Sequence, residues 1–311
     1  MEQYLLSQKD INSLLTVKDY RDIIRLLRSK NWAVAISTDD IDEIIRFERE
    51  NTIKTIKNLV SAKDNDINVI LYQIDFYNLK KAIRAVITEG SQESSFMPMG
   101  SVNPKLLFKC IKDQDFAQLP KFMEASAKEA FEILLKTNDA NLCDSLVDKT
   151  MLDEVMKLSK TTGCEFIKGY AELFVAFSDI KIALRGCKLK KSRRFFDIAL
   201  AECQSLNIDI LRKLACVDIE LLREYLLTTE YSDLFDDAGF PEDSLYLDKW
   251  FDDKVMALCS KQKSNPFTIA PIISYALARE LEFKNIKIVC IGKKLGASEP
   301  EINERLRKMY V

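Results

Sequence analysis

The stretch DFYNLKKAIRAVI, residues 75–87, contains a pattern that this chain uses three times. FSDIKIALRG at residues 177–186 and FKNIKIVCIG at residues 283–292 repeat it at a spacing of about a hundred residues. The shared pattern is Phe-x-(Asn/Asp)-(Leu/Ile)-Lys, and a small residue follows five positions after the lysine.

The spacing within each copy is that of an amphipathic helix. The Phe and the residues three and seven positions later share one helical face, which predicts a core stripe. The lysine and the position four residues after it lie along one edge of this stripe, and the small residue lets another backbone approach closely. The predicted core residues are Phe76, Phe177 and Phe283. The candidate interface residues are Lys80, Arg84, Lys181, Arg185 and Lys287, and Ile291 stands where a third arginine is expected.

A second pair of segments supports the repetition. VDKTMLDEVMKLSK at residues 147–160 matches LDKWFDDKVMALCSK at residues 247–261, again about a hundred residues apart. Two independent matches at this spacing predict a triplicated helical unit. The period is longer than the roughly 20–50 residues of common solenoid repeats. We therefore expect three small helical bundles, over residues 1–100, 101–200 and 201–311, related by an approximate threefold axis.

The composition predicts an all-α globular chain. Of 311 residues, 47% are apolar and 30% are charged, as in folded domains rather than disordered chains. Only 8 Gly and 7 Pro occur, which favours long helices over hairpins. The formal net charge of −2 gives no overall attraction to nucleic acid. No window approaches the roughly 18 apolar residues of a membrane span, so we expect a cytoplasmic protein.

Two residue types limit the chemistry of the chain. It contains no histidine, the commonest general base and nitrogen metal ligand. Its eight cysteines are scattered without a C-x-x-C pair, which predicts reduced, mostly buried thiols. We expect no catalytic residue, no cofactor-binding residue and no metal site.

Capping residues indicate where several helices begin. Asp19 is a candidate cap inside the apolar pattern that starts near the N-terminus, and Ser37 or Thr38 is the candidate N-cap of the next helix. Pro271 is suited to the first turn of a helix that leads to the third motif copy. Ser298 is the predicted cap of the last helix, where acidic residues follow it.

Longer segments are assigned from their periodicity. Residues 66–89 predict a helix that ends at Gly90, and residues 91–104 predict a connector. Residues 189–206 and 208–227 each predict helical structure.

In this order, the motifs resemble the C subunit family of bacterial and archaeal V-type ATPases and ATP synthases, whose eukaryotic relative is the vacuolar ATPase d subunit. The resemblance rests on DFYNLKKAIRA, FSDIKIALRG and ARELEFKNIKIVCIGKKLG, and it covers most of the chain. None of these is a chemical fingerprint such as a Walker loop, so the specificity comes from three copies in register. The chain departs from the family pattern at Ile291, and its abrupt N-terminus suggests that part of the first helix is missing.

The resemblance implies three similar helical units that form a funnel or socket. In that family the socket sits on the membrane rotor ring and receives the foot of the central stalk. It therefore implies a non-catalytic rotor adaptor that transmits torque for ion transport, peripheral to the membrane, with stalk subunits and ring as partners and no nucleic acid or cofactor. Two alternatives remain open: a helical interaction scaffold of another complex, and a carboxylate- or lysine-dependent enzyme, which the missing histidine disfavours.

Several local features have competing interpretations. The motif lysines either form a basic ring for an acidic partner or pair with a carboxylate inside their own unit, and we favour the second. KLKKSRR at residues 188–194 suggests a patch for nucleic acid or anionic lipid, but the overall charge favours a solvated helix junction. GKKLG at residues 292–296 lacks the spacing and the preceding strand of a phosphate loop. The acidic clusters lack metal-loop spacing, and Met97 and Met99 are expected to fill gaps rather than bind ligands.

Overall fold

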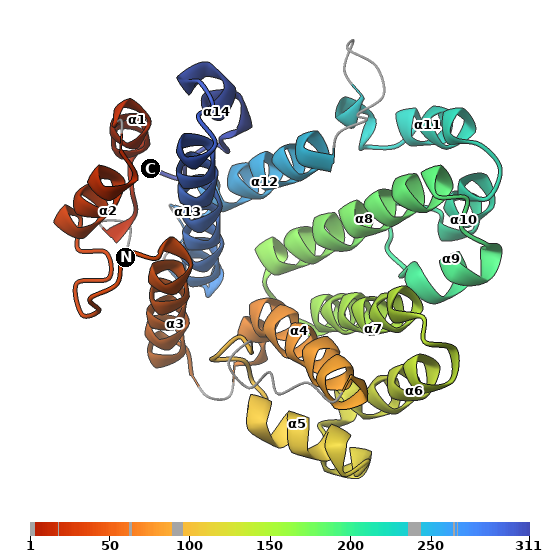
Figure 1. The fold of residues 1–311 in the computed structure, drawn as a ribbon. Helices are drawn as coiled ribbons and strands as arrows, with labels where there is room; N and C mark the ends of the chain where they lie inside the picture. The colour runs from red at the N-terminus through yellow and green to blue at the C-terminus, as the bar shows by residue number, and fades with distance from the viewer. Residues whose placement is uncertain are drawn as a thin grey trace. The chain divides into compact units, whose positions relative to one another are not determined.

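The chain is built of helices and the turns that join them. The computed structural model describes residues 4–17, 19–61, 64–88, 96–235, 244–263, 265 and 267–311 (Figure 1). Those residues contain no strand, which confirms the all-α prediction. The chain divides into two compact units, one made of Met1–Asp64 and Pro241–Val311 and the other of Asn65–Phe240. The threefold arrangement of three units stays a prediction.

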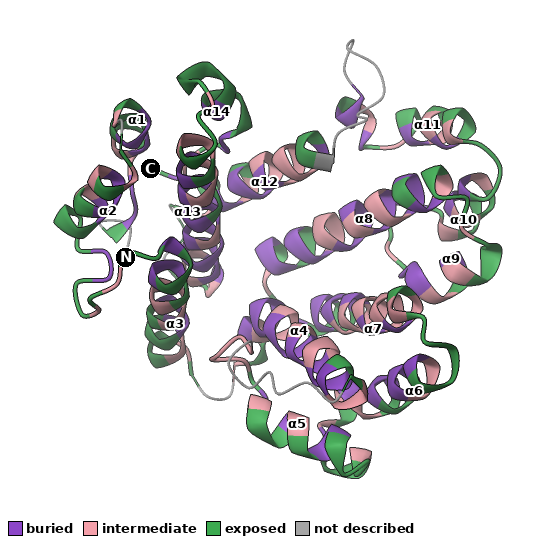
Figure 2. Cartoon of the chain, in the orientation of Figure 1, coloured by how far each residue is buried: buried purple, intermediate pink, exposed green. Residues whose placement is uncertain are grey.

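The first unit is built around one long helix, α13 (Ala270–Lys294), which carries the third motif copy. α13 packs against α3 (Ile41–Leu59) and α12 (Ser244–Ser260). Three short helices from the two ends of the chain also contact it, namely α1 (Gln8–Thr16), α2 (Tyr20–Ser29) and α14 (Glu299–Arg305). Because neighbours surround α13, buried residues run along most of its length (Figure 2).

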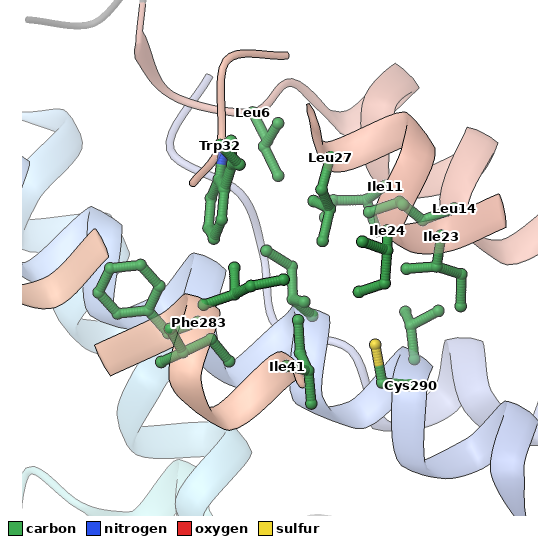
Figure 3. Packing of buried hydrophobic residues seen from close by; sticks show 14 of the residues in the cluster. Leu6, Ile11, Leu14, Ile23, Ile24, Leu27, Trp32, Ile41, Phe283 and Cys290 are labelled. Atoms are coloured by element: carbon green, nitrogen blue, oxygen red, sulfur yellow. The ribbon is translucent and has the colours of Figure 1, made fainter. Parts of the chain in front are cut away.

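Phe283 of α13 lies in the apolar core of this unit and is 1% exposed. The Trp32 ring meets it edge-on, with ring centroids 5.7 Å apart. Ile11, Ile23 and Ile41, which come from the three N-terminal helices, belong to the same cluster (Figure 3). Residues from both ends of the chain therefore form a single core.

The second unit is organised around α7 (Ala140–Thr161). Its neighbours are α4 (Asn68–Ile87), α6 (Lys121–Thr137), α8 (Glu165–Lys188) and α9 (Arg193–Ala199). α5 (Pro104–Lys112) packs on α4, and α10 (Ile208–Ala215) and α11 (Ile219–Leu227) pack on α8. The first and second motif copies lie on α4 and α8, and their phenylalanines, Phe76 and Phe177, are 1% and 6% exposed.

Several predicted helix starts are confirmed by their caps. The Asp19 side chain accepts a hydrogen bond from the backbone of α2 at its first turn. Pro271 occupies the first turn of α13. Ser298 and Glu301 form a capping box at the start of α14, in which each side chain accepts from the backbone of the other.

The predicted caps at Ser37 and Thr38 are wrong. α3 begins after Asp40, whose carboxylate accepts a hydrogen bond from the Asp42 N–H at 2.8 Å. Thr38 instead accepts from the Asp40 N–H at 3.1 Å, just before the helix. Asp40 is therefore the N-cap of α3, and the helix begins at Ile41, which is its first buried residue.

Two segments predicted as helical are interrupted. Within residues 189–206 only α9 is helical, and residues 208–227 form two helices, α10 and α11, separated by a short turn. Asp218 ends that turn by accepting a hydrogen bond from the Glu220 N–H at 2.7 Å. The helix over residues 66–89 is represented by α4, and Gly90 lies outside the described residues.

The Asn or Asp side chain at the third motif position hydrogen-bonds to the backbone of the segment that follows its motif helix. Asn78 accepts a hydrogen bond from the Met97 N–H and donates one to the Met97 carbonyl, both at 2.8 Å. Asn285 makes the same two bonds with Arg307, at 2.9 and 3.0 Å. We call this two-bond arrangement the clasp. Its recurrence gives a structural reason for the Asn/Asp position of the motif.

The second copy makes only half of the clasp. Asp179 Oδ1 accepts from the Ala201 N–H at 3.1 Å, while its Oδ2 is buried without a partner in the part of the chain that the structure describes. Burial raises the pKa of Asp179 well above its usual range, and the Asp153 charge raises it further, against the lowering effects of Ala201, Lys149 and Arg212. A protonated Oδ2 is a hydrogen-bond donor, as the Asn amide is in the other copies. The raised pKa of Asp179 favours its neutral form, which resembles the Asn side chains of the other two copies.

Asp179→Asn is expected to raise the free energy of unfolding by about 1–3 kcal/mol at pH 8, because an amide supplies a donor without burying a charge. A raised pKa means that stability is fully present below the unfolded value of 3.8 and is lost as the pH rises through the folded pKa. The increase in the free energy of unfolding caused by Asp179→Asn should therefore become smaller as the pH falls toward 4. Urea titrations at both pH values measure it. The matched variant Asn285→Asp should lose stability mainly at pH 8, and a pH-independent effect of both changes would contradict this assignment.

The small residue of the motif makes room for the helix that follows. A Cβ added to Gly186 would lie 2.5 Å from the Phe196 ring of α9, and one added to Gly292 would lie 2.6 Å from Ile302 of α14. Phe196 and Ile302 are buried, at 0% and 1% exposed, so each would have to shift within the core to make room for a Cβ. In these two copies the glycine therefore sets the distance between the motif helix and its successor.

Gly186→Ala is expected to lower the free energy of unfolding by about 1–3 kcal/mol, because the new methyl overpacks the contact with α9. Gly169→Ala in the same helix should instead stabilise the protein by roughly 0.5–1 kcal/mol, the usual helical advantage of Ala over Gly. A Cβ at Gly169 meets nothing within 4 Å. Urea titration followed by circular dichroism compares the two variants. Equal stabilities would show that Phe196 yields freely.

Candidate functional site

Two of the three motif lysines pair with a helix from a different third of the chain. Lys80 Nζ lies 2.5 Å from Asp148 Oδ1 on α7, and Lys287 Nζ lies 2.6 Å from Asp42 Oδ1 on α3. The first pair joins the first predicted unit to the second, and the second pair joins the third to the first. Both pairs cross the predicted hundred-residue bounds, but each lies within one compact unit of the structure, because α4 packs on α7 and α13 packs on α3.

The other motif residues have different surroundings. Arg84 forms an ion pair with Asp144 on α7. Lys181 Nζ lies 5.9 Å from the ring centroid of its own motif phenylalanine. Arg185 is exposed, and Ile291, which stands at the equivalent position of the third copy, is 53% exposed. The departure at Ile291 therefore places an apolar side chain at a solvent-facing position.

A pocket between α7, α8 and α9 is lined by residues of the second motif copy and by two carboxylates that pair with the first copy. Its volume is about 270 Å³. Asp144 and Asp148 line it from α7, and these are the carboxylates that pair with Arg84 and Lys80 of the first copy. Arg185 of the second copy lines it from α8. The remaining lining residues are Asn141, Ser145, Ile182, Gly186, Leu189, Lys191 and Phe195.

Asp144 is only partly hydrogen-bonded in this pocket. Arg84 donates to its Oδ2, whereas Oδ1 is buried and has no hydrogen-bond partner among the described residues. Burial raises the pKa of this carboxyl, and the charges of Arg84 and Lys80 oppose that rise. Oδ1 is therefore a buried acceptor that makes no hydrogen bond to the described residues, which is unusual for a buried polar atom.

The basic run at residues 188–194 lies at the junction of α8 and α9, beside the same pocket. Most of its residues are exposed, which fits the solvated helix junction favoured from the sequence. Within the described chain, five cations here take part in no ion pair with an acidic side chain. We call them the basic surface: Arg185, Lys190, Lys191, Arg193 and Arg194.

A buried charged cluster in the first unit is absent from the sequence predictions. Arg279 of α13 is 4% exposed and lies 2.7 Å from both Glu48 and Glu282. Its guanidinium also lies 4.4 Å from the Trp32 ring centroid. Burial raises the pKa of Glu282 to about 7. The Arg279 charge and the hydrogen bond that the Leu6 N–H donates to Glu282 both lower this pKa, but by less than burial raises it.

One signal in the sequence marks this cluster. An acidic residue stands directly before the motif phenylalanine in two copies, Asp75 in the first and Glu282 in the third. Both are buried, and Asp75 accepts hydrogen bonds from the backbone of Ser101 and Val102. A carboxylate at the edge of a predicted core stripe indicates a buried hydrogen-bonding role, because a charge is buried only with partners.

The other sequence features that were considered as possible sites are explained by where they lie in the fold. GKKLG forms the last turn of α13 and the residues just after it, with Gly292 against Ile302, so it is not a phosphate loop. No group of three or more metal-ligating side chains is found among the described residues, and none of the helices described there is long and apolar enough to cross a membrane. All eight cysteines are free, but the expectation of mostly buried thiols holds for only half of them: Cys110, Cys143, Cys259 and Cys290.

Comparison with known proteins gives consistent matches along the chain. The family model described as "ATP synthase (C/AC39) subunit" matches residues 1–305. The C subunit of the V-type sodium ATPase of Enterococcus hirae is 24% identical over 275 residues, which cover 87% of this chain and 83% of that protein. The C subunit of the A-type ATP synthase of Halorubrum lacusprofundi is 24% identical over 251 residues, which cover 76% of this chain and 72% of that protein.

Proposed function

This chain belongs to the ATP synthase (C/AC39) subunit family, and on that basis we propose that it is a non-catalytic rotor adaptor of a V-type or A-type ATPase. In this role it links the central stalk to the membrane rotor ring and transmits torque between ATP turnover and ion transport. The observation that carries the proposal is the family match over residues 1–305. The two C subunit relatives match over most of their own lengths, which supports a role for the whole chain rather than for one segment.

The sequence supports a role without chemistry of its own. The chain has no histidine to act as general base and no Walker loop to hold phosphates. The motif residues Lys80, Lys287 and Asn285 are engaged in ion pairs and a clasp that join their helices to other segments. These are contacts that stiffen a helical body, which is what a part that transmits force needs.

The geometry also supports a mechanical use of the repeat. A part that carries torque must resist shear between its successive segments. The Lys80–Asp148 and Lys287–Asp42 pairs each tie a motif helix to the long helix of another third of the chain. We propose that the motif lysines are ties between repeats, and that three repeats over residues 1–100, 101–200 and 201–311 form the socket for the stalk.

A binding assay and an activity assay test this function together. The purified chain should capture the central-stalk subunits of its own complex in a pull-down at low and at high salt, and should show no ATP hydrolysis when alone. Capture of the stalk separates an adaptor from a scaffold of another assembly. Loss of capture at both salt concentrations, or ATP turnover that survives rigorous purification, would refute the adaptor role.

A further inference from the structure

Buried Arg279 connects two carboxylates, each of which also holds a backbone N–H of another segment. Glu48 Oε2 accepts a hydrogen bond from Arg279 at 2.7 Å, and its Oε1 accepts one from the Ala33 N–H at 2.7 Å. Glu282 Oε2 accepts from Arg279 at 2.7 Å, and its Oε1 accepts from the Leu6 N–H. Both oxygens of each side chain are therefore acceptors, which is the hydrogen-bonding pattern of an ionised carboxylate.

The Leu6 contact anchors the short stretch before α1, residues 4–6, which we call the leading segment. Leu5 and Leu6 are buried, and Leu6 belongs to the same apolar cluster as Trp32 (Figure 3). Within the part of the chain that the structure describes, the bond from the Leu6 N–H to Glu282 is the only hydrogen bond between the leading segment and any of the α-helices. The leading segment is therefore held by one polar contact and by the burial of two leucines.

Protonation of Glu282 weakens one of its two hydrogen bonds. The neutral acid carries an O–H donor on one oxygen and loses the negative charge that strengthens both bonds. Arg279 stays charged at any physiological pH and is 4% exposed, so it retains the oxygen without the proton, because a buried cation without partners is costly. The proton is therefore expected on Oε1, where it faces the Leu6 N–H. Two donors that face each other do not hydrogen-bond, so the leading segment loses its anchor.

The groups that face Glu282 place this protonation near neutral pH. Burial raises its pKa to about 7, the Arg279 charge and the Leu6 hydrogen bond lower it, and the Glu48 charge on α3 raises it. Tyr275 of α13 faces the same cluster, where burial raises its pKa, the Arg279 charge lowers it and the Glu282 charge raises it. On the other elements that contact α13, these charged residues have ion-pair partners of their own: Asp252 of α12 with Lys284 and Arg307, Asp10 of α1 with Lys30, Asp22 of α2 with Arg25, and Glu299 of α14 with Lys293.

We propose that Glu282 is a proton-operated latch for the leading segment: its ionised carboxylate holds the Leu6 backbone on α13, and its protonation lets the segment detach. Detachment exposes Leu5 and Leu6 and uncovers the cluster around Trp32. Protonation also removes the cost of a buried charge, so the folded chain as a whole gains stability as the pH falls through about 7, while the leading segment loosens. The latch does not depend on the adaptor function, because it acts inside the first unit.

Hydrogen exchange of the full-length chain at pH 6, 7 and 8 tests the latch, with each rate corrected for the intrinsic exchange rate at that pH. Mass spectrometry with electron-transfer fragmentation resolves the Leu6 amide. With a pKa of about 7, the ionised fraction of Glu282 falls from about nine-tenths at pH 8 to about one-tenth at pH 6. The protection of the Leu6 amide should therefore fall about tenfold between pH 8 and pH 6, while the amides of α3 and α13 keep their protection.

Two substitutions on α13 separate the latch from other effects of pH. Glu282→Gln removes the charge and keeps one acceptor oxygen for two donors. Its Leu6 amide should therefore be as weakly protected at pH 8 as that of the unchanged protein is at pH 6. Glu280→Gln removes a carboxylate whose side chain is 35% exposed and pairs with Arg49, so it should keep the pH dependence of the unchanged protein.

Equal protection of the Leu6 amide at pH 6 and pH 8 in the unchanged protein would overturn the latch. So would a pH-dependent loss that persists in Glu282→Gln, or one that is absent from Glu280→Gln. A loss that spreads to the amides of α3 and α13 at pH 6 would also overturn it, because the whole unit rather than the leading segment would then respond. If Glu282→Gln does not fold, the profiles of the unchanged protein and of Glu280→Gln decide the question.

Discussion

Phe283→Ala is expected to lower the free energy of unfolding of the first unit by about 3–5 kcal/mol, because it leaves a cavity where a fully packed ring stood. Phe283 is 1% exposed and meets Trp32 edge-on. The Arg279 guanidinium also lies 5.1 Å from its ring centroid. The variant therefore loses ring contacts together with apolar burial.

Tryptophan fluorescence during urea titration reports this change, because both tryptophans of the chain, Trp32 and Trp250, lie in the first unit. Phe267→Ala is the matched control, since Phe267 is 95% exposed and its removal should change stability by less than about 0.5 kcal/mol. A loss below about 1 kcal/mol for Phe283→Ala would mean that the core closes around the missing ring.

Arg279→Met is expected to cost about 3–5 kcal/mol at pH 8, because it leaves buried carboxylates without their cation. Glu282 is 1% exposed, and Glu48 shares the same guanidinium. The second half of the prediction concerns pH. Burial raises the pKa of Glu282 from 4.5 to about 7, so its contribution to stability is fully present below pH 4.5 and is lost as the pH rises through about 7.

Removal of Arg279 takes away the charge that holds this pKa down, so the loss of stability should extend to higher pH in the variant. The difference in the free energy of unfolding between Arg279→Met and the unchanged protein should therefore be smaller near pH 5 than at pH 8. Arg49→Met provides the control, because Arg49 pairs with Glu280 across the same two helices but the two side chains are 26% and 35% exposed. It should cost about 1 kcal/mol or less, with little pH dependence. A deficit for Arg279→Met that does not vary between pH 5 and 8 would contradict the role assigned to Glu282.

Local signals in the sequence are sufficient for the helical class and for several helix ends. Asp19, Pro271 and Ser298 act on backbone groups within a few residues, so their effects are visible in the sequence itself. The segment after α9 departs from its predicted helix because Asp179, far away in sequence, accepts the hydrogen bond of Ala201. Tertiary contacts there override local periodicity.

In the candidate site, too, some residues are predictable from the sequence and their contacts are not. The repeat alone identifies Lys80, Lys287 and the Asn/Asp position. Asp148 recurs in the second matched segment, but the repeat does not pair it with Lys80, and nothing in the sequence assigns Asp42 to Lys287. Arg279 was not predicted for a similar reason. Charged residues are seldom buried, and its burial is explained only by its partners Glu48 and Glu282.

The shared core of the two chain ends has a consequence for synthesis on the ribosome. Arg49 of α3 and Glu280 of α13 pair at a separation of 231 residues. At about 5–20 residues per second, α3 leaves the ribosome roughly 10–50 s before α13 exists to cover it. The contiguous second unit is complete earlier. Nascent chains should therefore expose Ile11, Ile23 and Ile44 for that interval, which makes the N-terminal helices the natural substrate for a chaperone that binds during translation.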